Sequence, residues 1–268
     1  FQKYFKRAYM NKITGTIITL NNEKLITDCI QSLKKVCDEI IVLDSLSSDR
    51  TIEISKELGA KTFLQEFLGD GPQKKKAATY AKNKWILSID ADERLEDELI
   101  DFINSLSLED TNETAFSFKR RNFCGSKWIK AASFYPDRVT RLYNREVVNY
   151  NTNTSHAFVE AKAKKIDYHI IHFTYSSYTD WIDKINFYSS QSAKTMHIQG
   201  VKRSTIRPIT HSLFAFFKKL IFKGGIFQGI DGFTVAITTM FNTYMKYTKL
   251  NELYDTKADP DKHFPKSK

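Results

Sequence analysis

The sequence has few of the residues that mark disordered or disulfide-linked proteins. It contains 10 glycines and 5 prolines in 268 residues, whereas 41% of its residues are hydrophobic and 13% are aromatic. This composition excludes extensive disorder. The three cysteines, Cys29, Cys37 and Cys124, are odd in number and lack C-x-x-C spacing. They indicate reduced core thiols in a cytosolic protein rather than a disulfide framework or a zinc site.

Long hydrophobic segments are also missing. Residues 1–11 carry three basic side chains and no apolar stretch follows them, so no signal peptide is visible. No apolar run approaches the roughly 20 residues that span a bilayer. We therefore expect a cytoplasmic protein, with one large domain and an appendage at most.

Acidic residues are scarce relative to basic ones. The net charge of +10 fits an anionic partner, which is a nucleic acid, a nucleotide or an anionic membrane surface. The imbalance is strongest in residues 201–250, which contain 8 Lys and Arg but 1 Asp, a net charge of 8 − 1 = +7. Charge alone does not choose among these partners.

The first half of the chain alternates between strand and helix patterns. We expect strands at 13–20, 39–43, 60–67 and 85–89, separated by helices at 23–37, 48–58 and 73–82. Asp49 or Ser48 is the expected N-cap of the second helix, Gly59 its stop, and Gly69–Pro72 a break before the third. This order predicts an α/β fold with a mainly parallel sheet covered by helices on both faces.

Polar residues follow three of these strands. Thr19 and Asn21, then Asp44, then Asp90-Ala91-Asp92 all come at carboxyl ends, where ligands bind in such sheets. Asp90 and Asp92 are suited to holding Mg²⁺ or Mn²⁺ while substrate phosphates complete the coordination shell. The alternative is a solvated acidic turn that caps a helix starting near Glu96.

Two further residues fit a nucleotide. Asp44 can accept a hydrogen bond from a nucleobase imide, while Ser47, Ser48 and Asp49 cap the next helix. Lys74 lies in the first turn of a helix, where the dipole favours anions, and can reach a diphosphate. Its neighbours Lys75 and Lys76 are expected mainly in solvent.

After residue 106 the pattern changes to strands at 115–119, 138–143, 156–160 and 167–173, then a helix from 178 to 196. Asp137 and Glu160, in this region, are the first and second candidates for a general base, and Glu93, which precedes it, is the last. The alternative for Asp137 is an ion pair with Arg138 or Arg141. His172 is a candidate metal ligand or diphosphate contact, although it can equally be a polar strand residue.

These motifs together resemble a known family. Residues 16–21, 44–51, 69–77 and 85–94 look like the successive motifs of family 2 inverting glycosyltransferases. Pro136-Asp137-Arg138, Arg141–Tyr143, His156 and His172–Tyr175 resemble the lipopolysaccharide inner-core enzymes of that family, which add a hexose, typically glucose. The resemblance runs from about Lys12 to Leu253.

The resemblance implies a GT-A nucleotide-diphospho-sugar fold, a UDP-sugar donor and inversion at the anomeric carbon. It places Thr19 and Asn21 near the nucleoside, Asp44 on the base, and Lys74 near the base or diphosphate. Asp90, with Ala91, lies near the ribose or metal, and Asp92 on the metal. The implied cofactor is Mg²⁺ or Mn²⁺, and the implied acceptor is a lipopolysaccharide core or a related lipid-linked glycan.

The sequence departs from the family in three places. Asn22 stands where the family usually has an acid, Lys74-Lys75 replaces an Arg-Asn pair, and His156-Ala157 replaces a His-Glu pair. A degenerate transferase that only binds sugar nucleotides therefore remains an alternative. A nucleic-acid-binding protein does not explain acids at successive strand ends. A pyrophosphorylase would need a glycine-rich loop, and residues 19–23 contain no glycine.

The C-terminal part is aromatic and basic. An apolar helix over 213–222 carries Lys218, Lys219 and Lys223, Gly224-Gly225 ends it, and residues 233–250 form a second amphipathic stretch. This pattern favours contact with an anionic membrane surface, such as the inner face of the cytoplasmic membrane, over simple packing on the core. We expect a transferase domain at 12–200, with a donor half at 12–110 and an acceptor half at 111–200. A helical extension at 201–254 and a flexible tail at 255–268 follow, and no nucleic acid is expected as a partner.

Overall fold

The computed structural model describes residues 11–153 and 157–256, which fall into two compact units. Unit 1 is formed by the residues up to Arg121 together with Asp137–Phe173. Unit 2 is formed by Asn122–Pro136 and the residues from Thr174 onward. Both units are interleaved in the chain, because the segment 122–136 leaves unit 1 and the chain then returns to it.

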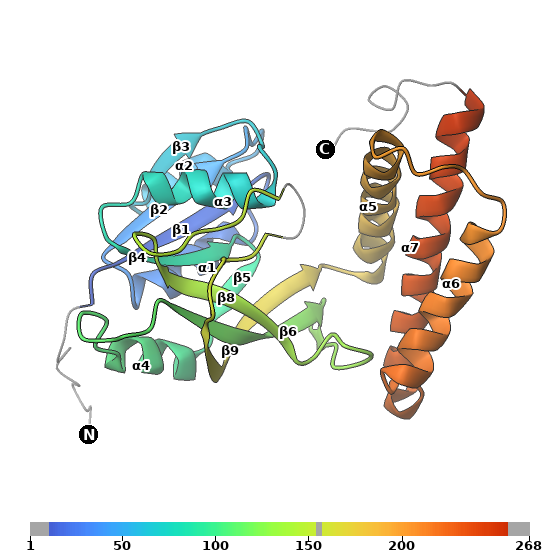
Figure 1. Cartoon of the computed structure of the whole chain (residues 1–268). Helices are drawn as coiled ribbons and strands as arrows, with labels where there is room; N and C mark the ends of the chain where they lie inside the picture. Colours follow the sequence, from blue (N-terminus) through green and yellow to red (C-terminus); the bar gives the residue numbers. More distant parts are fainter. Residues whose placement is uncertain (1–10, 154–156, 257–268) are drawn as a thin grey trace. The chain divides into compact units, whose positions relative to one another are not determined.

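The first half of unit 1 has the predicted alternating order (Figure 1). Its elements are β1 (Ile13–Thr19), α1 (Ile26–Lys34), β2 (Glu39–Asp44), α2 (Thr51–Glu57), β3 (Lys61–Leu64), α3 (Asp70–Thr79) and β4 (Trp85–Asp90). The four strands pair in parallel in the order β3-β2-β1-β4. In this register Thr19 lies beside Asp44 and Ile18 beside Asp90, so the carboxyl ends of these strands are level.

The remaining strands make the sheet mixed. They are β5 (Glu93–Leu95), β6 (Ala115–Cys124), β7 (Lys127–Trp128), β8 (Asp137–Asn144) and β9 (Lys164–Tyr175), with α4 (Asp97–Ser105) after β5. Within the described residues the sheet order is β3-β2-β1-β4-β8-β6-β9-β5, and β7 pairs with β6. The pairs β4–β8, β6–β8 and β5–β9 are antiparallel.

Successive side chains of β4 belong to two different hydrophobic clusters of unit 1, one on each face of the sheet. Trp85, Leu87 and Ile89 belong to the cluster that contains the buried faces of α1 and α4. Ile86 points to the other face, where it belongs to a cluster with Ala78 of α3. Successive strand residues face opposite sides of a sheet, so helices cover both faces as predicted.

The secondary structure differs from the prediction at three places. The third helix begins at Asp70 rather than at residue 73, and Pro72 occupies its first turn as predicted, where no intrahelical N–H bond is needed. The short strand β5 was not predicted. The strand predicted at 156–160 is wrong for its described part, 157–160, where only the single bridge Tyr150–Val159 forms.

The helices of unit 2 are α5 (Tyr178–Ile198), α6 (Arg207–Phe217), the π-helical turn η1 (Lys218–Phe222), the 3₁₀ turn η2 (Gly225–Gln228) and α7 (Gly229–Thr256). The buried ammonium of Lys249 joins α7 to α5 through hydrogen bonds to the Asn186 carbonyl at 2.7 Å and to the hydroxyls of Ser189 and Ser190 at 2.8 Å. The two predicted C-terminal helices exist, and both are longer than predicted.

Among the described residues, no single helix has the length and apolar composition to cross a membrane. One bent pair, Arg207–Phe222 with Gly225–Asp255, passes that test when the two helices are taken together.

Candidate active site

The carboxyl ends of β1 and β2 form one wall of the candidate site. Asn21 has a left-handed φ of 52°, a conformation that asparagine tolerates. Its backbone N–H donates to Ser47 Oγ at 2.8 Å, and the Ser48 N–H donates to Asn21 Oδ1 at 2.9 Å. Thr19 is tied to the same loop, since its carbonyl accepts the Ser45 N–H at 2.8 Å. The structure therefore joins the segment of Thr19 and Asn21 to the turn after β2.

Asp44 is fully buried at the end of β2. Its Oδ1 accepts the Ser47 N–H at 2.7 Å and its Oδ2 accepts the Ser47 hydroxyl at 2.5 Å. The carboxylate therefore shapes its own turn, which the sequence did not predict. The predicted N-cap, Asp49 or Ser48, is wrong, because the N-cap of α2 is Arg50, which makes no side-chain cap hydrogen bond. Asp49, one position earlier, accepts the Thr51 N–H through Oδ1 at 3.0 Å.

Lys74 and Asp90 form an ion pair between α3 and the end of β4. The Lys74 ammonium contacts Asp90 Oδ1, and only 6% of the lysine side chain is exposed. The ammonium also lies 5.6 Å from the ring centroid of Tyr150, within the range of a cation–π contact. Lys75, the next residue, is exposed as predicted. Lys74 is therefore the lysine of this helix that faces the site.

The ion pair continues inward as an alternating row of charges. Arg141, on β8, binds Asp90 and the fully buried Glu93 through Nη2, at 2.5 Å each. Arg120, on β6, binds Glu93 Oε1 at 3.1 Å and Asp137 Oδ2 at 2.7 Å. We call Lys74, Asp90, Arg141, Glu93, Arg120 and Asp137 the charge network. It is contributed by five different elements and brings the predicted Lys74, Asp90 and Asp137 into one connected group.

The network shifts the ionisation of its carboxyls. Burial by itself raises the pKa of Asp90, but the charges of Arg141 and Lys74 outweigh it and hold this pKa below its ordinary value. Burial likewise raises the pKa of Glu93, and Arg141 with Arg120 brings it below the ordinary value despite repulsion from Asp90. Both acids are therefore carboxylates at neutral pH, which the paired arginines require.

Asp92 lies outside this network and faces His172. The Asp92 Oδ2 atom is 3.4 Å from His172 Nε2, and the Phe173 N–H donates to the Asp92 carbonyl at 2.9 Å. The side chains of Asp92 and His172 are 28% and 14% exposed, so both remain reachable. Two of the three predicted metal ligands are thus brought together, while the third, Asp90, has its carboxylate bound to Lys74 and Arg141.

The Asp92–His172 pair offers one carboxylate and one imidazole to a divalent ion. In the part of the chain that the structure describes, no group of three or more His, Cys, Asp or Glu side chains is placed to hold one. A carboxylate and an imidazole 3.4 Å apart fit an ion such as Mn²⁺ or Mg²⁺ that takes its remaining ligands from substrate phosphates.

The three candidate bases lie in different environments. Asp137 begins β8 with a side chain 27% exposed, and its ion partner is Arg120 rather than the predicted Arg138 or Arg141. Arg138 instead pairs with Asp167. Glu160 is exposed, and its backbone N–H donates to the Asn149 carbonyl at 3.0 Å.

Glu93, the last of the candidates, has no exposed surface, so its carboxylate cannot approach an acceptor hydroxyl. His156 lies outside the described residues.

Comparison with known proteins identifies the family of this chain. Residues 16–161, more than half of the chain, match the family described as "Glycosyl transferase family 2". The chain belongs to glycosyltransferase family 2. The matched region contains every predicted donor-site residue except His172, and it ends before unit 2's helices.

This glycosyltransferase is similar to several others over nearly its whole length. It is 34% identical to an "Uncharacterized glycosyltransferase" of Rickettsia bellii, covering 90% of this chain and 87% of that protein. It is 24% identical to the "Lipopolysaccharide core biosynthesis glycosyltransferase LpsC" of Rhizobium meliloti, covering 93% and 95%. Among solved structures, TarS of S. aureus has 13% identity and a TM-score of 0.48, covering 91% of this chain and 55% of that one.

Sequence reasoning missed two residues of the transferase site. Arg120 links Glu93 to Asp137, and Tyr150 packs against Lys74. A signal for Arg120 was present, because Lys119-Arg120-Arg121 directly continues an apolar strand. Basic residues on a half-buried strand need carboxylate partners. No comparable signal marked Tyr150, which lies far from Lys74 in sequence.

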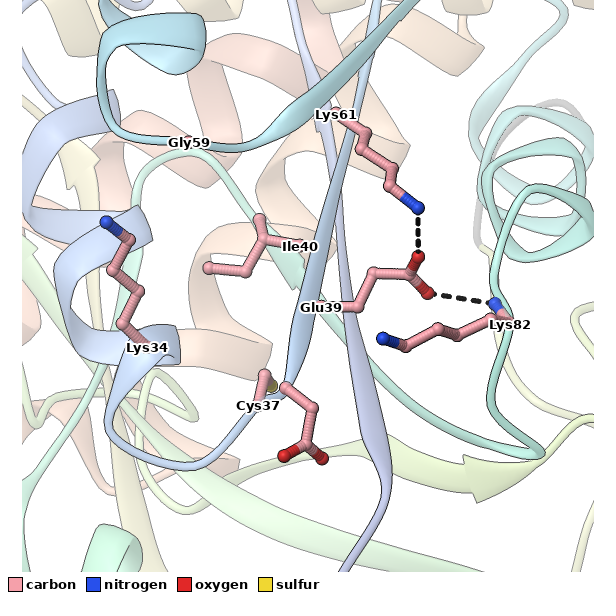
Figure 2. A pocket seen from close by; sticks show the side chains of 8 residues that line it. Lys34, Cys37, Glu39, Ile40, Gly59, Lys61 and Lys82 are labelled. Carbon is pink, nitrogen blue, oxygen red and sulfur yellow. Dashed lines mark hydrogen bonds and ion pairs between the residues drawn. The ribbon is translucent and has the colours of Figure 1, made fainter.

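A hollow at the other edge of the sheet is unrelated to this site. Figure 2 shows it at the amino ends of the strands, where Glu39 binds Lys61 Nζ at 2.7 Å and the Lys82 N–H at 2.8 Å. Its lining residues are Lys34, Cys37, Asp38, Glu39, Ile40, Gly59, Lys61 and Lys82. Parallel α/β sheets bind ligands at the carboxyl ends, so the hollow does not compete with the candidate site.

Proposed function

We propose that this glycosyltransferase moves a hexose, glucose in the first instance, from a UDP-sugar to a lipopolysaccharide core or a related envelope glycan, with inversion at the anomeric carbon. The observation that carries the donor half is the alignment of the carboxyl ends of β2 and β4, the two strands that flank β1. The turn of Asp44 follows β2, and the Lys74–Asp90 and Asp92–His172 pairs lie at the end of β4. These groups can contact the base, the ribose and the diphosphate of the UDP-sugar along the same edge of the sheet.

Each part of the donor has a matching group. The turn that Thr19, Asn21 and Asp44 hold together receives the nucleoside. The Lys74 ammonium, in the second turn of α3 rather than in its first turn as predicted, supplies positive charge for the diphosphate. Its pairing with Asp90 keeps that charge in place before substrate arrives, so little rearrangement is needed on binding.

A divalent ion is part of this proposal. Asp92 and His172 would hold Mg²⁺ or Mn²⁺, which neutralises charge on the departing diphosphate. The carboxylate and imidazole are kept together by the Phe173–Asp92 backbone hydrogen bond, which fixes β9 against the turn after β4. A pair held this way is ready for an ion at no further cost in chain ordering.

Inversion needs one base that takes the proton of the acceptor hydroxyl as this oxygen bonds to the anomeric carbon. Asp137 is the first candidate, because its side chain is partly exposed and Arg120 orients its carboxylate. The acceptor class is supported by the relative named for lipopolysaccharide core biosynthesis, which is 24% identical over 93% of this chain.

The donor proposal is tested by thermal unfolding. UDP at about 100 times its Kd, with Mn²⁺ present, is expected to add about 2.7 kcal/mol to the stability of the protein, since a ligand that binds only the folded state stabilises it by mass action. Asp92→Asn should lose the part of this shift that EDTA removes from the wild type. Asp101→Asn, an exposed carboxylate on α4, is the matched control and should behave as wild type.

A panel of nucleoside diphosphates that leaves the wild-type unfolding curve unchanged would contradict the donor site. Transfer of radiolabel from a panel of UDP-sugars to lipopolysaccharide acceptors then identifies the sugar. Asp137→Asn should abolish transfer while leaving the UDP-induced shift intact. A wild type that binds UDP and transfers nothing would instead support the binding-module alternative.

A further inference from the structure

The helices α6 and α7 form an antiparallel hairpin within unit 2. The Ser204 N–H donates to Asn251 Oδ1 at 3.0 Å, Tyr247 Oη contacts His211 Nδ1 at 3.0 Å, and the rings of Phe216 and Phe233 lie 5.9 Å apart. As residue numbers rise along α6, their partners along α7 fall. The turn of this hairpin lies at residues 218–229.

The hairpin exposes an apolar stripe on each of its two helices, and these two stripes together are called its apolar face. On α6, Ile206, Ile209, Leu213 and Phe217 are exposed at spacings of three and four residues, so they share one side of the helix. The pattern continues on α7. Ile230, Phe233, Ile237, Phe241 and Tyr244 are exposed at spacings of three or four.

The turn of the hairpin is the most apolar part of this face. Phe222 and Phe227 are 75% and 89% exposed, an arrangement that a surface in water alone does not favour. The turn is nevertheless built tightly. A Cβ on Gly232 would lie 1.9 Å from the Gly225 carbonyl oxygen, so the two backbones touch there. The exposed phenylalanines are therefore presented on a closely packed turn.

Basic side chains surround the turn. Lys218 and Lys223 are exposed on either side of Phe222, whereas Asp231, the single acid in residues 201–250, is bound to Lys127 at 2.6 Å. The turn thus offers apolar rings and free ammonium groups together. An anionic bilayer matches both features, because its apolar interior receives the rings and its headgroups pair with the lysines.

We propose that this hairpin inserts its turn and apolar face into the interface of an anionic bilayer, with Lys218 and Lys223 against the headgroups. In this proposal the hairpin, which is the bent pair that passes the spanning test only when its two helices are taken together, enters one leaflet and does not cross it. A transferase held this way works at a membrane surface, such as the inner face of the cytoplasmic membrane. The proposal does not depend on which sugar is transferred.

Flotation of the full chain with vesicles tests this. Vesicles of phosphatidylcholine with 30% phosphatidylglycerol are expected to carry the wild type upward at low salt. Phe222→Ser/Phe227→Ser should reduce binding by roughly 10-fold or more, since each buried ring contributes substantially. Lys218→Gln/Lys223→Gln should reduce it roughly 30-fold on anionic vesicles only, at about 5-fold per lysine.

Matched controls lie outside the hairpin. Val147→Ser/Phe158→Ser removes two exposed apolar side chains of unit 1, and Lys24→Gln/Lys56→Gln removes two exposed lysines there. Both should float as wild type. Circular dichroism shows whether every variant is folded. The UDP-induced thermal shift is scored separately, so failure of the donor site is distinguished from failure of membrane binding.

A wild type that stays at the bottom of the gradient with anionic vesicles at low salt overturns the proposal. So does a Phe222→Ser/Phe227→Ser variant that floats unchanged. Sedimentation that instead shows a dimer, lost in this variant, assigns the face to a second copy. Retention of the wild type on vesicles after an alkaline carbonate wash would contradict interfacial insertion, because it indicates a spanning segment.

Discussion

At the scale of single residues, the site is governed by the pairing of buried charges. Arg141 contacts two carboxylates, Asp90 and Glu93, while only 5% of its own side chain is exposed. Such groups are costly to bury alone and tolerable when paired. The pairing explains how the end of β4 can carry acids inside a folded core. It also means that each member of the charge network depends on its neighbours.

Replacement of Arg141 should therefore be severe. Arg141→Met leaves Asp90 and Glu93 close together without their shared counter-charge, and we expect the free energy of unfolding to fall by about 3–5 kcal/mol. Urea denaturation measures this. Arg50→Met, which removes an exposed ion pair with Glu53, should leave the free energy of unfolding close to that of the wild type. Equal losses in the two variants would contradict the role given to the network.

The same residues predict a response to acid. The folded-state pKa values of Asp90 and Glu93 lie below their ordinary values, so their stabilisation is present above about pH 4 and is lost as pH falls through the folded-state values. Melting temperature measured from pH 7 to pH 2.5 should decline below pH 4. Glu93→Gln should be less stable at pH 7 and show a shallower decline. A variant curve parallel to that of the wild type would refute the assignment.

At the scale of elements, the early start of α3 decides how the site is assembled. Gly71 lies in its first turn and donates its N–H to the Asn153 carbonyl at 3.0 Å. This contact holds the segment that follows Tyr150 against α3, and so keeps Tyr150 beside Lys74. From the sequence, Gly69–Pro72 was predicted only to separate a strand from a helix that starts at residue 73, because Gly and Pro dominate it. Tertiary contact with residues 151–153 turned those residues into the start of a helix.

Gly71 is accordingly a sensitive position. A Cβ there would lie 2.4 Å from the Asn151 carbonyl oxygen, so Gly71→Ala should lower stability by about 1–3 kcal/mol and weaken UDP binding. Gly59→Ala is the control, since its Cβ meets nothing within 4 Å and only its φ of 74° is strained. Denaturant unfolding and UDP titration separate the two effects. UDP affinity should be unchanged in the control.

At the scale of the whole molecule, the described chain has separate cores in its two units. The large cluster of unit 1 contains Ile17 and Leu99, whereas Ala193, Leu250 and Leu253 form a cluster in unit 2. The candidate site draws on unit 1, and the proposed membrane surface draws on unit 2. The two activities therefore rest on different sets of packed side chains.

Substitutions in the two cores should destabilise the two units independently of each other. Leu250→Ala removes a buried side chain from α7 and should lower the stability of unit 2 by about 2–5 kcal/mol. Hydrogen exchange should show faster exchange in α5 and α7, with the protection of β1 and β4 unchanged. Leu99→Ala should do the reverse. If Leu250→Ala accelerated exchange equally in β1 and β4, the units would not be separate in stability.

Much of unit 1 could be predicted from the sequence because its signals are local. Buried strands, helical spacing and the stop at Gly59 determined the order of elements, and parallel pairing then placed Thr19, Asp44 and Asp90 at one edge. The charged and aromatic character of residues 201–250 was equally clear without coordinates. The domain boundaries and the roles of Asp137 and Glu160 stay predictions.

The sequence by itself determined which residues gather at the carboxyl edge, because strand alternation and connection rules act along the chain. Only the tertiary structure decided how those residues share their charges. Asp90 binds Lys74 and Arg141, while Asp92 faces His172, which is 80 positions further along the chain. Antiparallel strands from the second half bring Arg141, Arg120 and His172 to the end of β4. Electrostatic partners are set by distance in space, which the local pattern of a sequence does not record.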